Sequence, residues 1–145
     1  MSKLGELKLQ SSIDKRIGAL VGTAEKLITE RTSKLNLIDA SQIRNAMAVA
    51  NSAPHVAVVT NFIRYQMGRT GAPGKAWKDT GLGEAVNKEI DGTIHKLAEE
   101  TVKDAGFGET DAVQAQLTRL LLGFMHRRYV YEADKLKAGK EGKNV

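Results

Sequence analysis

The sequence predicts an all-α protein, a compact bundle of about five helices in a single domain over residues 1–145. Three observations favour this fold. Apolar residues recur at helical spacing, Gly and Pro gather in a few short breaks, and no stretch alternates apolar and polar residues for long enough to form a sheet. A length of 145 residues, 41% of them hydrophobic, suits one domain with a buried core. Residues 1–10 and 138–145 are expected to be frayed tails.

A first helix is expected over about residues 12–35, with Ser11 or Ser12 as its cap. Its apolar residues follow the 3.6-residue period of one helix face. Gly18 and Gly22 interrupt this helix on nearly the same side. Since glycine inside a helix costs roughly 1 kcal/mol relative to alanine, their presence predicts a close crossing with another helix. The expected inner face is Ile13, Ile17, Leu20, Val21, Ala24, Leu27 and Ile28.

Two helices are expected in the next segment. Asp39, followed three residues later by Gln42, resembles a capping box for a helix over about 40–52. Pro54 is typical of a first helical position and predicts a third helix over about 54–67. The expected inner face of this third helix is Val56, Val59, Ile63 and Met67.

The second half of the chain predicts a loop and two more helices. Residues 70–80 contain closely spaced Gly and Pro and are expected to form a loop. A fourth helix over about 82–104 should end at Gly106 in the left-handed conformation. Thr110 is expected to cap the last helix, over about 111–137, which carries a long apolar face.

Composition excludes several classes of protein. The chain has no cysteine, so it has neither disulfides nor thiolate metal sites. Its first residues lack the apolar core of a signal peptide, and no apolar run approaches the roughly 20 residues of a membrane span. We therefore expect a cytoplasmic protein without a membrane partner.

Catalytic and metal-binding motifs are absent from the sequence. Residues 68–75 look superficially like a phosphate-binding P-loop, but the spacing is one residue too long and Ala76 replaces the Ser or Thr. His55, His95 and His126 are far apart, without acidic partners at ligand spacing. No Ser or Thr has a credible base nearby in sequence. We expect a protein that is not an enzyme and has no cofactor or metal.

Charge is distributed unevenly along the chain. Between Ala40 and Lys78 there is no Asp or Glu, although acids are scattered through the rest of the sequence. The charge of this segment equals the net charge of the whole chain, +5. A segment that excludes one sign of charge predicts a partner carrying that sign, most commonly a phosphate backbone, although a half-buried region with few charges would look similar. Its cations are Arg44, Arg64, Arg69, Lys75 and Lys78.

Aromatic residues and a second basic pair extend this prediction. Tyr65 and Trp77 lie beside basic residues and are candidates for stacking on unpaired bases, although Trp77 could equally pin its loop to the bundle. Arg127 and Arg128 on the last helix are further candidates for phosphate contacts. An alternative for this pair is ordinary ion pairing with Glu132 or Asp134 one turn later. Tyr129 and Tyr131 are favoured as core or interface residues.

Three short motifs carry a resemblance to a known family. They are Ser41-Gln42-Ile43-Arg44, then Asn61-Phe62-Ile63-Arg64-Tyr65-Gln66-Met67-Gly68-Arg69, then Leu121-Leu122-Gly123-Phe124-Met125-His126-Arg127-Arg128-Tyr129. The series resembles the helical small subunits of type III CRISPR effector complexes (Csm-type), and the likeness spans about residues 12–132.

The resemblance implies a non-catalytic subunit of an RNA-guided ribonucleoprotein in antiviral defence. Copies would stack along the complex beside its backbone and large subunits, and would contact the guide RNA–target RNA duplex or single-stranded nucleic acid. By matching the family motif, Arg44, Arg64 and Arg69 would face nucleic acid. The sequence does not distinguish target RNA from displaced DNA.

Two other functions are compatible with the residues themselves. One is a free-standing helical nucleic-acid-binding protein, although the Pro54 start and the apolar run after it make a poor recognition helix. The other is a structural adaptor bundle whose basic segment binds an acidic protein.

Overall fold

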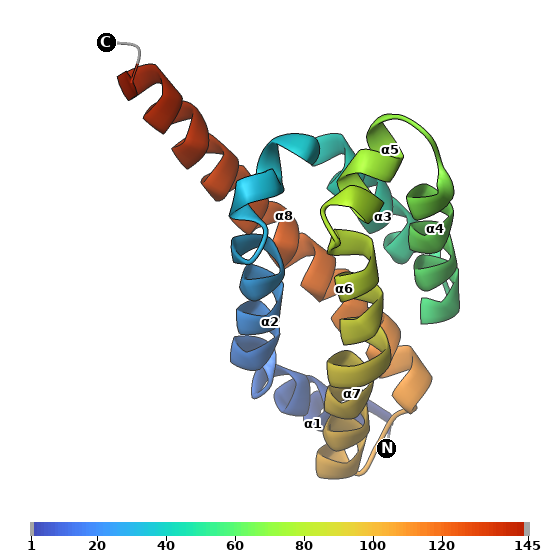
Figure 1. Cartoon of the computed structure of the whole chain (residues 1–145). Coiled ribbons are helices and arrows are strands. Elements are labelled where there is room, and N and C mark those ends of the chain that lie inside the picture. The colour runs from blue at the N-terminus through green and yellow to red at the C-terminus, as the bar shows by residue number, and fades with distance from the viewer. Residues whose placement is uncertain (1, 144–145) are drawn as a thin grey trace.

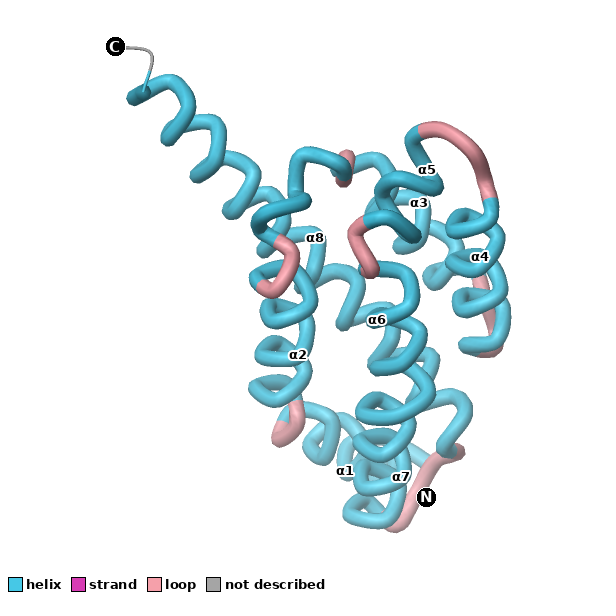
Figure 2. Tube along the Cα trace, in the orientation of Figure 1, coloured by secondary structure: helices cyan, strands magenta, loops and turns pink. Residues whose placement is uncertain are grey.

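The computed structural model describes residues 2–143, and over this range the protein is all-α, as predicted. Eight α-helices occur in the described residues, where about five were expected, together with a short 3-10 segment (η1) and two π-helical turns (η2 and η3). Loops between them are short (Figure 2). The elements are α1 Ser2–Asp14, α2 Ile17–Thr29, η1 Thr32–Leu37, α3 Ala40–Ser52, α4 Val56–Gly68, α5 Ala72–Gly74, η2 Lys75–Asp79, α6 Leu82–Glu89, η3 Ile90–Ile94, α7 His95–Ala105 and α8 Thr110–Lys143.

The long helix α8 is the element around which the others pack. Figure 1 shows it passing diagonally behind α2, α6 and α7, and it contacts α2, α3 and α7 directly. Its inner face is fully or almost fully buried, as with Leu117, Leu121 and Met125. The hydroxyl of Tyr129, a predicted core residue, is buried and donates a hydrogen bond of 2.6 Å to the Ile38 carbonyl. Tyr131, also expected in the core or an interface, is 58% exposed.

The expected first helix is divided into α1, α2 and η1, and residues 2–10 are helical instead of frayed. The division occurs where Arg16 turns back: its guanidinium donates to the Ser12 carbonyl at 2.9 Å and to Asp104 of α7 at 3.3 Å. Arginine near a helix end commonly satisfies the last carbonyls in this way. Gly18 and Gly22 are exposed, and a side-chain carbon added at either would meet nothing within 4 Å, so the predicted close crossing is wrong.

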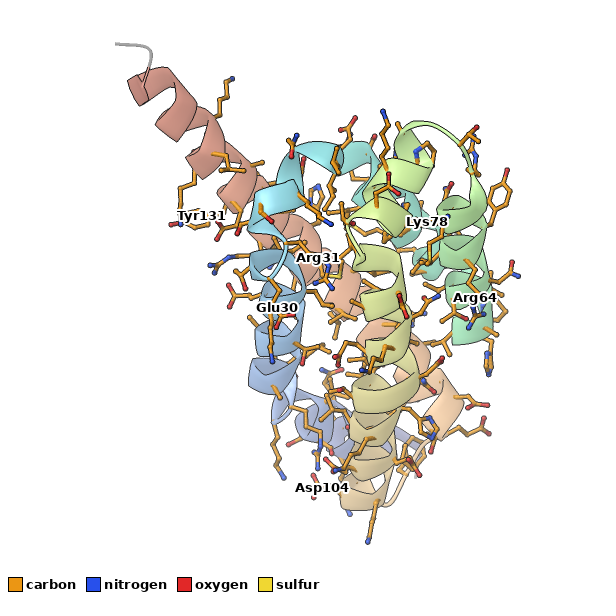
Figure 3. The ribbon with its side chains drawn as sticks, in the orientation of Figure 1. Glu30, Arg31, Arg64, Lys78, Asp104 and Tyr131 are labelled. Atoms are coloured by element: carbon orange, nitrogen blue, oxygen red, sulfur yellow. The ribbon has the colours of Figure 1, made fainter. Side chains whose placement is uncertain are left out.

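A polar cluster joins α1 to α7 at one end of the molecule, where Figure 3 labels Asp104. The Ser12 hydroxyl donates to Asp104 Oδ2 at 2.9 Å, and Lys15 forms an ion pair with the same oxygen at 3.4 Å. The hydrogen bond from Ser12, then Arg16 and the charge of Lys15, hold the pKa of Asp104 below its usual value.

The central helices agree with prediction except at one start. Asp39 caps α3 by accepting a hydrogen bond from the Ser41 backbone N–H at 3.3 Å. Helix α4 begins at Val56, two residues later than expected, because the Nδ1 atom of His55 accepts from the Ala57 N–H at 3.0 Å and serves as the cap. Pro54 therefore precedes the helix.

The predicted fourth helix corresponds to α6, η3 and α7, which follow one another without a loop. Leu82, Val86, Ile90 and Ile94 are buried as expected, and Gly106 ends the helix with φ 64°. The predicted tail 138–145 is helical over residues 138–143; residues 144–145, like residue 1, lie outside the described residues. No helix among residues 2–143 combines the length and apolar content that crossing a lipid bilayer would need.

Candidate nucleic-acid interface

A basic hollow lies where α4 ends and the chain turns into α5 and η2. It has a volume of about 340 Å³. Three cations, Arg69, Lys75 and Lys78, line it together with the single carboxylate of Asp79, which gives a net charge of +2. The remainder of its wall is largely Gly-rich backbone between Met67 and Gly74. Figure 3 labels Lys78 in this region, beside α4.

Local sequence explains why the chain folds back so tightly here. Gly71 adopts φ 79°, a conformation that favours glycine, and α5 begins at the next residue. The backbone of Gly74 is buried directly against the carbonyl of Arg69, leaving no room for a side chain. Residues 70–80, predicted as a loop, are therefore mostly helical over α5 and η2. This compact turn brings Lys75 and Lys78 toward the end of α4.

Trp77 anchors the turn from inside. Its side chain is 0% exposed, and η2 packs against both α4 and α6. The predicted stacking role of Trp77 is wrong for this reason, because its ring has no face open to a ligand. The alternative interpretation, that Trp77 pins the segment to the bundle, is confirmed. Single π-helical turns such as η2 are frequent at functional sites, and this one carries both lysines of the hollow.

Arg69 is held in a defined position at the edge of the hollow. Its guanidinium donates a hydrogen bond of 3.2 Å to the side-chain oxygen of Gln66, which is buried. The same guanidinium lies 5.5 Å from the centroid of the Tyr65 ring, within the range of a cation–π contact. Tyr65 is 61% exposed. Arg69 and Tyr65 thus form one surface that faces solvent.

Cations in the acid-free segment lack carboxylate partners. Among the side chains that the structure describes, those of residues 3–139, no ion pair involves Arg44, Arg64 or any cation of the hollow. All of these side chains are exposed. Their charge is therefore available to an external anion, which is the physical requirement for binding phosphate.

Arg64 lies one helical turn from the hollow, whereas Arg44 lies on another helix and does not line the hollow. Arg64 and Gly68 are four residues apart on α4, so they lie one turn from each other on the same face of the helix, and Gly68 lines the hollow. Figure 3 labels Arg64 on α4. Arg44 is exposed on α3 and does not line the hollow.

Arg127 and Arg128 belong to a different surface. They line a groove between α2 and α8 with Val21, Glu25 and Tyr131, and this groove shares no residue with the basic hollow. Arg128 forms ion pairs with Glu25 and Glu132, and hydrogen bonding to Glu25 is the main cause of the raised pKa of Arg128. The predicted pairing with Glu132 is confirmed. Arg128 is therefore not a free cation. Arg127 is exposed, but it lies in this groove and does not line the basic hollow, so neither arginine is part of the candidate interface.

A second hollow of about 420 Å³ between α2 and α6 is larger but less suited to an anion. It carries both signs of charge, Lys26, Arg31 and Lys88 beside Glu30 and Glu89. Arg31 donates to the carbonyl oxygens of Leu27 at 2.8 Å and Gly81 at 3.4 Å, so it joins the two walls. Figure 3 labels Glu30 and Arg31 at this position.

Two residues of the site were not among those predicted from the sequence: Asp79, which lines the hollow, and Gln66, which holds Arg69. Asp79 is the first acid after the acid-free segment, and its proximity to Lys78 in sequence was a signal that could have placed it in the site. Gln66 carried no such signal, because its role depends on burial. Among residues 3–139, whose side chains the structure describes, no group of three His, Asp or Glu side chains is arranged to hold a metal ion.

Comparisons with protein-family models, with curated protein sequences and with solved structures find no match for this chain.

Proposed function

We propose that this protein is a non-catalytic nucleic-acid-binding subunit that contacts the phosphate backbone through the basic hollow and Arg64. One observation carries the proposal: Arg69, Lys75 and Lys78 converge on one exposed hollow, and none of them forms an ion pair with a described side chain (residues 3–139), although the carboxylate of Asp79 also lines the hollow. Arg64 extends this surface by one helical turn.

The chemistry of these side chains suits the phosphate groups of a nucleic acid. Arginine offers a planar fork of donors that matches an oxyanion, and each lysine supplies a point charge. Contacts of this kind position a nucleic acid without reading its sequence. The turn between α4 and α6 lets phosphate groups approach backbone as well as side chains, because it is rich in glycine.

The particular role we propose is that of a small subunit in a type III CRISPR effector complex. The support is the resemblance of three motifs, two of which contain Arg44, Arg64 and Arg69. In that role the protein would associate with backbone and large subunits and with further copies of itself in the cytoplasm, as part of antiviral defence. The guide–target duplex or a single strand would be its nucleic acid.

Charge reversal tests the backbone-binding proposal. The variant R64E/R69E/K78E is compared with the matched control K8E/K96E/K103E. The control changes net charge equally, at exposed lysines of α1 and α7 that form no ion pair with the side chains of residues 3–139. Fluorescence anisotropy with a labelled RNA at low salt should show affinity falling by on the order of 100-fold or more in the first variant only. Circular dichroism verifies that both variants remain helical.

Three outcomes would contradict the proposal. Equal losses in both variants would indicate a response to net charge alone. Absence of RNA and DNA binding by the unaltered protein at low salt, with capture of an acidic protein unaffected by nuclease, would favour the adaptor function. Strong preference for one sequence with a defined half-site spacing would favour a free-standing sequence reader. Co-purification of short RNA and larger subunits from the native host tests the effector role separately.

A further inference from the structure

An exposed apolar stripe on α4 leads to the basic hollow. Val58 is 44% exposed, Phe62 is half-buried, and Tyr65 is 61% exposed. Their spacing of four and three residues places them on one face of the helix. Arg69 follows four residues after Tyr65, at the edge of the hollow. An aromatic surface is thus continuous with a phosphate-binding one.

We propose that this surface holds unpaired nucleotides, with one base stacked on Tyr65 and its phosphate on Arg69. This inference rests on the proposed function and adds the class of nucleic acid: a single strand in preference to a duplex. The neighbouring phosphates of the same strand lie over Lys75 and Lys78 in the hollow. Phe62 and Val58 offer an apolar surface to the next base along α4.

Geometry supports stacking at Tyr65. The Arg69 guanidinium is 5.5 Å from the centre of the ring, so a nucleotide whose base lies against the Tyr65–Arg69 pair has its phosphate within reach of the arginine. Gln66 holds that guanidinium in place through a hydrogen bond of 3.2 Å. Stacking of this kind works with any base, because every base has a π face, and it therefore agrees with contacts that do not read sequence.

A duplex cannot use the same surface fully. Within a double helix both faces of each base are covered by neighbouring base pairs, so an aromatic side chain reaches them only at an open end. The cations would still bind the backbone of a duplex. The preference for a single strand over a duplex therefore depends on Tyr65, and the affinity that both kinds of nucleic acid share depends on the cations.

Tyr131 on α8 provides a matched control. It is 58% exposed and also lies beside cations: the centroid of its ring is 5.4 Å from Arg128 Cζ and 5.7 Å from Lys135 Nζ. Both cations are paired with carboxylates, Arg128 with Glu25 and Lys135 with Glu132. In Figure 3 Tyr131 and Arg64 lie on opposite sides of the view. Tyr131 shares the chemistry of Tyr65 but not its free positive charge.

The test compares three ligands of about 12 nucleotides, a length within the usual footprint of single-strand sites. They are a mixed-sequence single-stranded RNA, an abasic phosphodiester chain of equal charge, and a blunt duplex. The proteins are the unaltered chain, Tyr65→Leu, Tyr65→Phe and Tyr131→Leu. Affinities are measured by anisotropy competition at one salt concentration, after circular dichroism has verified folding.

We expect Tyr65→Leu to weaken binding of the single strand by roughly 5- to 100-fold, while Tyr65→Phe and Tyr131→Leu leave it nearly unchanged. The abasic chain should bind the unaltered protein at least as weakly as the RNA binds Tyr65→Leu, because it also lacks the base that contacts Phe62, and its affinity should not change with that substitution. Affinity for the duplex should likewise not change with Tyr65→Leu. Equal affinity for the RNA, the abasic chain and the duplex would overturn the single-strand inference and leave backbone binding standing. Failure of every ligand to bind would overturn the proposed function itself.

Discussion

Gly74 packs against the carbonyl oxygen of Arg69 so closely that no side chain fits between them. This contact joins the end of α4 to the turn that follows and places a cation of each segment on the same hollow. The basic surface thus depends on a backbone contact as much as on charged side chains.

Gly74→Ala should destabilise the protein by about 1–3 kcal/mol, because the added methyl group forces the turn away from Arg69. The same substitution should lower affinity for RNA, since it moves Lys75 away from its position relative to Arg69 in the hollow. Gly22→Ala is the control: it lies in α2 with nothing within 4 Å of the added carbon. That change should stabilise the protein by about 0.5–1 kcal/mol. Urea unfolding measures both, and equal effects of the two substitutions would contradict the close contact.

Asp79→Asn removes the carboxylate from the hollow and should raise affinity for RNA. The expected gain is about two- to fivefold at low salt, because exposed charges interact weakly through water. Asp91→Asn makes the same change of charge in η3, away from the hollow, and serves as the reference. If both substitutions increase affinity equally, the hollow is not where phosphate binds.

Asp104 should contribute to stability in a pH-dependent way. Its pKa in the folded protein is lowered by the Ser12 hydroxyl, Arg16 and Lys15, so the folded state favours the ionised form. This contribution is fully present above the pKa of an unpaired aspartate, near pH 4, and is lost as the pH falls through the folded-state pKa. The stability difference between the unaltered protein and Asp104→Asn should therefore be constant near neutral pH and shrink in acid. A difference that does not shrink as the pH falls below about 4, or one no larger than that of the exposed Asp134→Asn, would contradict the contacts of Asp104 with Ser12, Arg16 and Lys15.

Tyr129→Phe deletes the hydroxyl that donates to the Ile38 carbonyl at 2.6 Å. Removing one partner of a buried hydrogen bond leaves the carbonyl unsatisfied, and the expected cost is about 1 kcal/mol. Burial, assisted by the charge of Asp39, also raises the pKa of Tyr129. Tyr131→Phe alters an exposed hydroxyl and should change stability by less than about 0.5 kcal/mol. Thermal unfolding of the two variants separates these expectations, and similar midpoints would contradict them.

Much of the fold was predictable because periodic apolar faces decide helix positions. Helix α3, the inner face of α4 and the Gly106 end of α7 all follow local rules of period and capping. The breaks were not predictable, because they depend on tertiary contacts. Arg16 ends α1 by reaching Asp104, 88 residues away, and no local pattern contains that bond.

In the candidate site too, features of local sequence were predictable and contacts between distant residues were not. Absence of acids from the segment made Arg64, Arg69, Lys75 and Lys78 visible in the sequence as free cations. The burial of Trp77 was left open, because both a core and a surface tryptophan occur beside lysines. The ion pair between Arg128 and Glu25, which leaves Arg128 unavailable to an external anion, could not be predicted, since the two residues are 103 positions apart in the sequence.

Helix α8 has a consequence for how the protein is made. A ribosome synthesises α2, α3 and α7 before α8, the helix against which all three pack. The apolar faces of these helices therefore remain unburied until residues 110–143 have emerged from the ribosome, and during that time they can aggregate or bind a chaperone. A stalled nascent chain lacking those residues should consequently remain sensitive to protease, and a chain in which they have left the ribosome should become resistant.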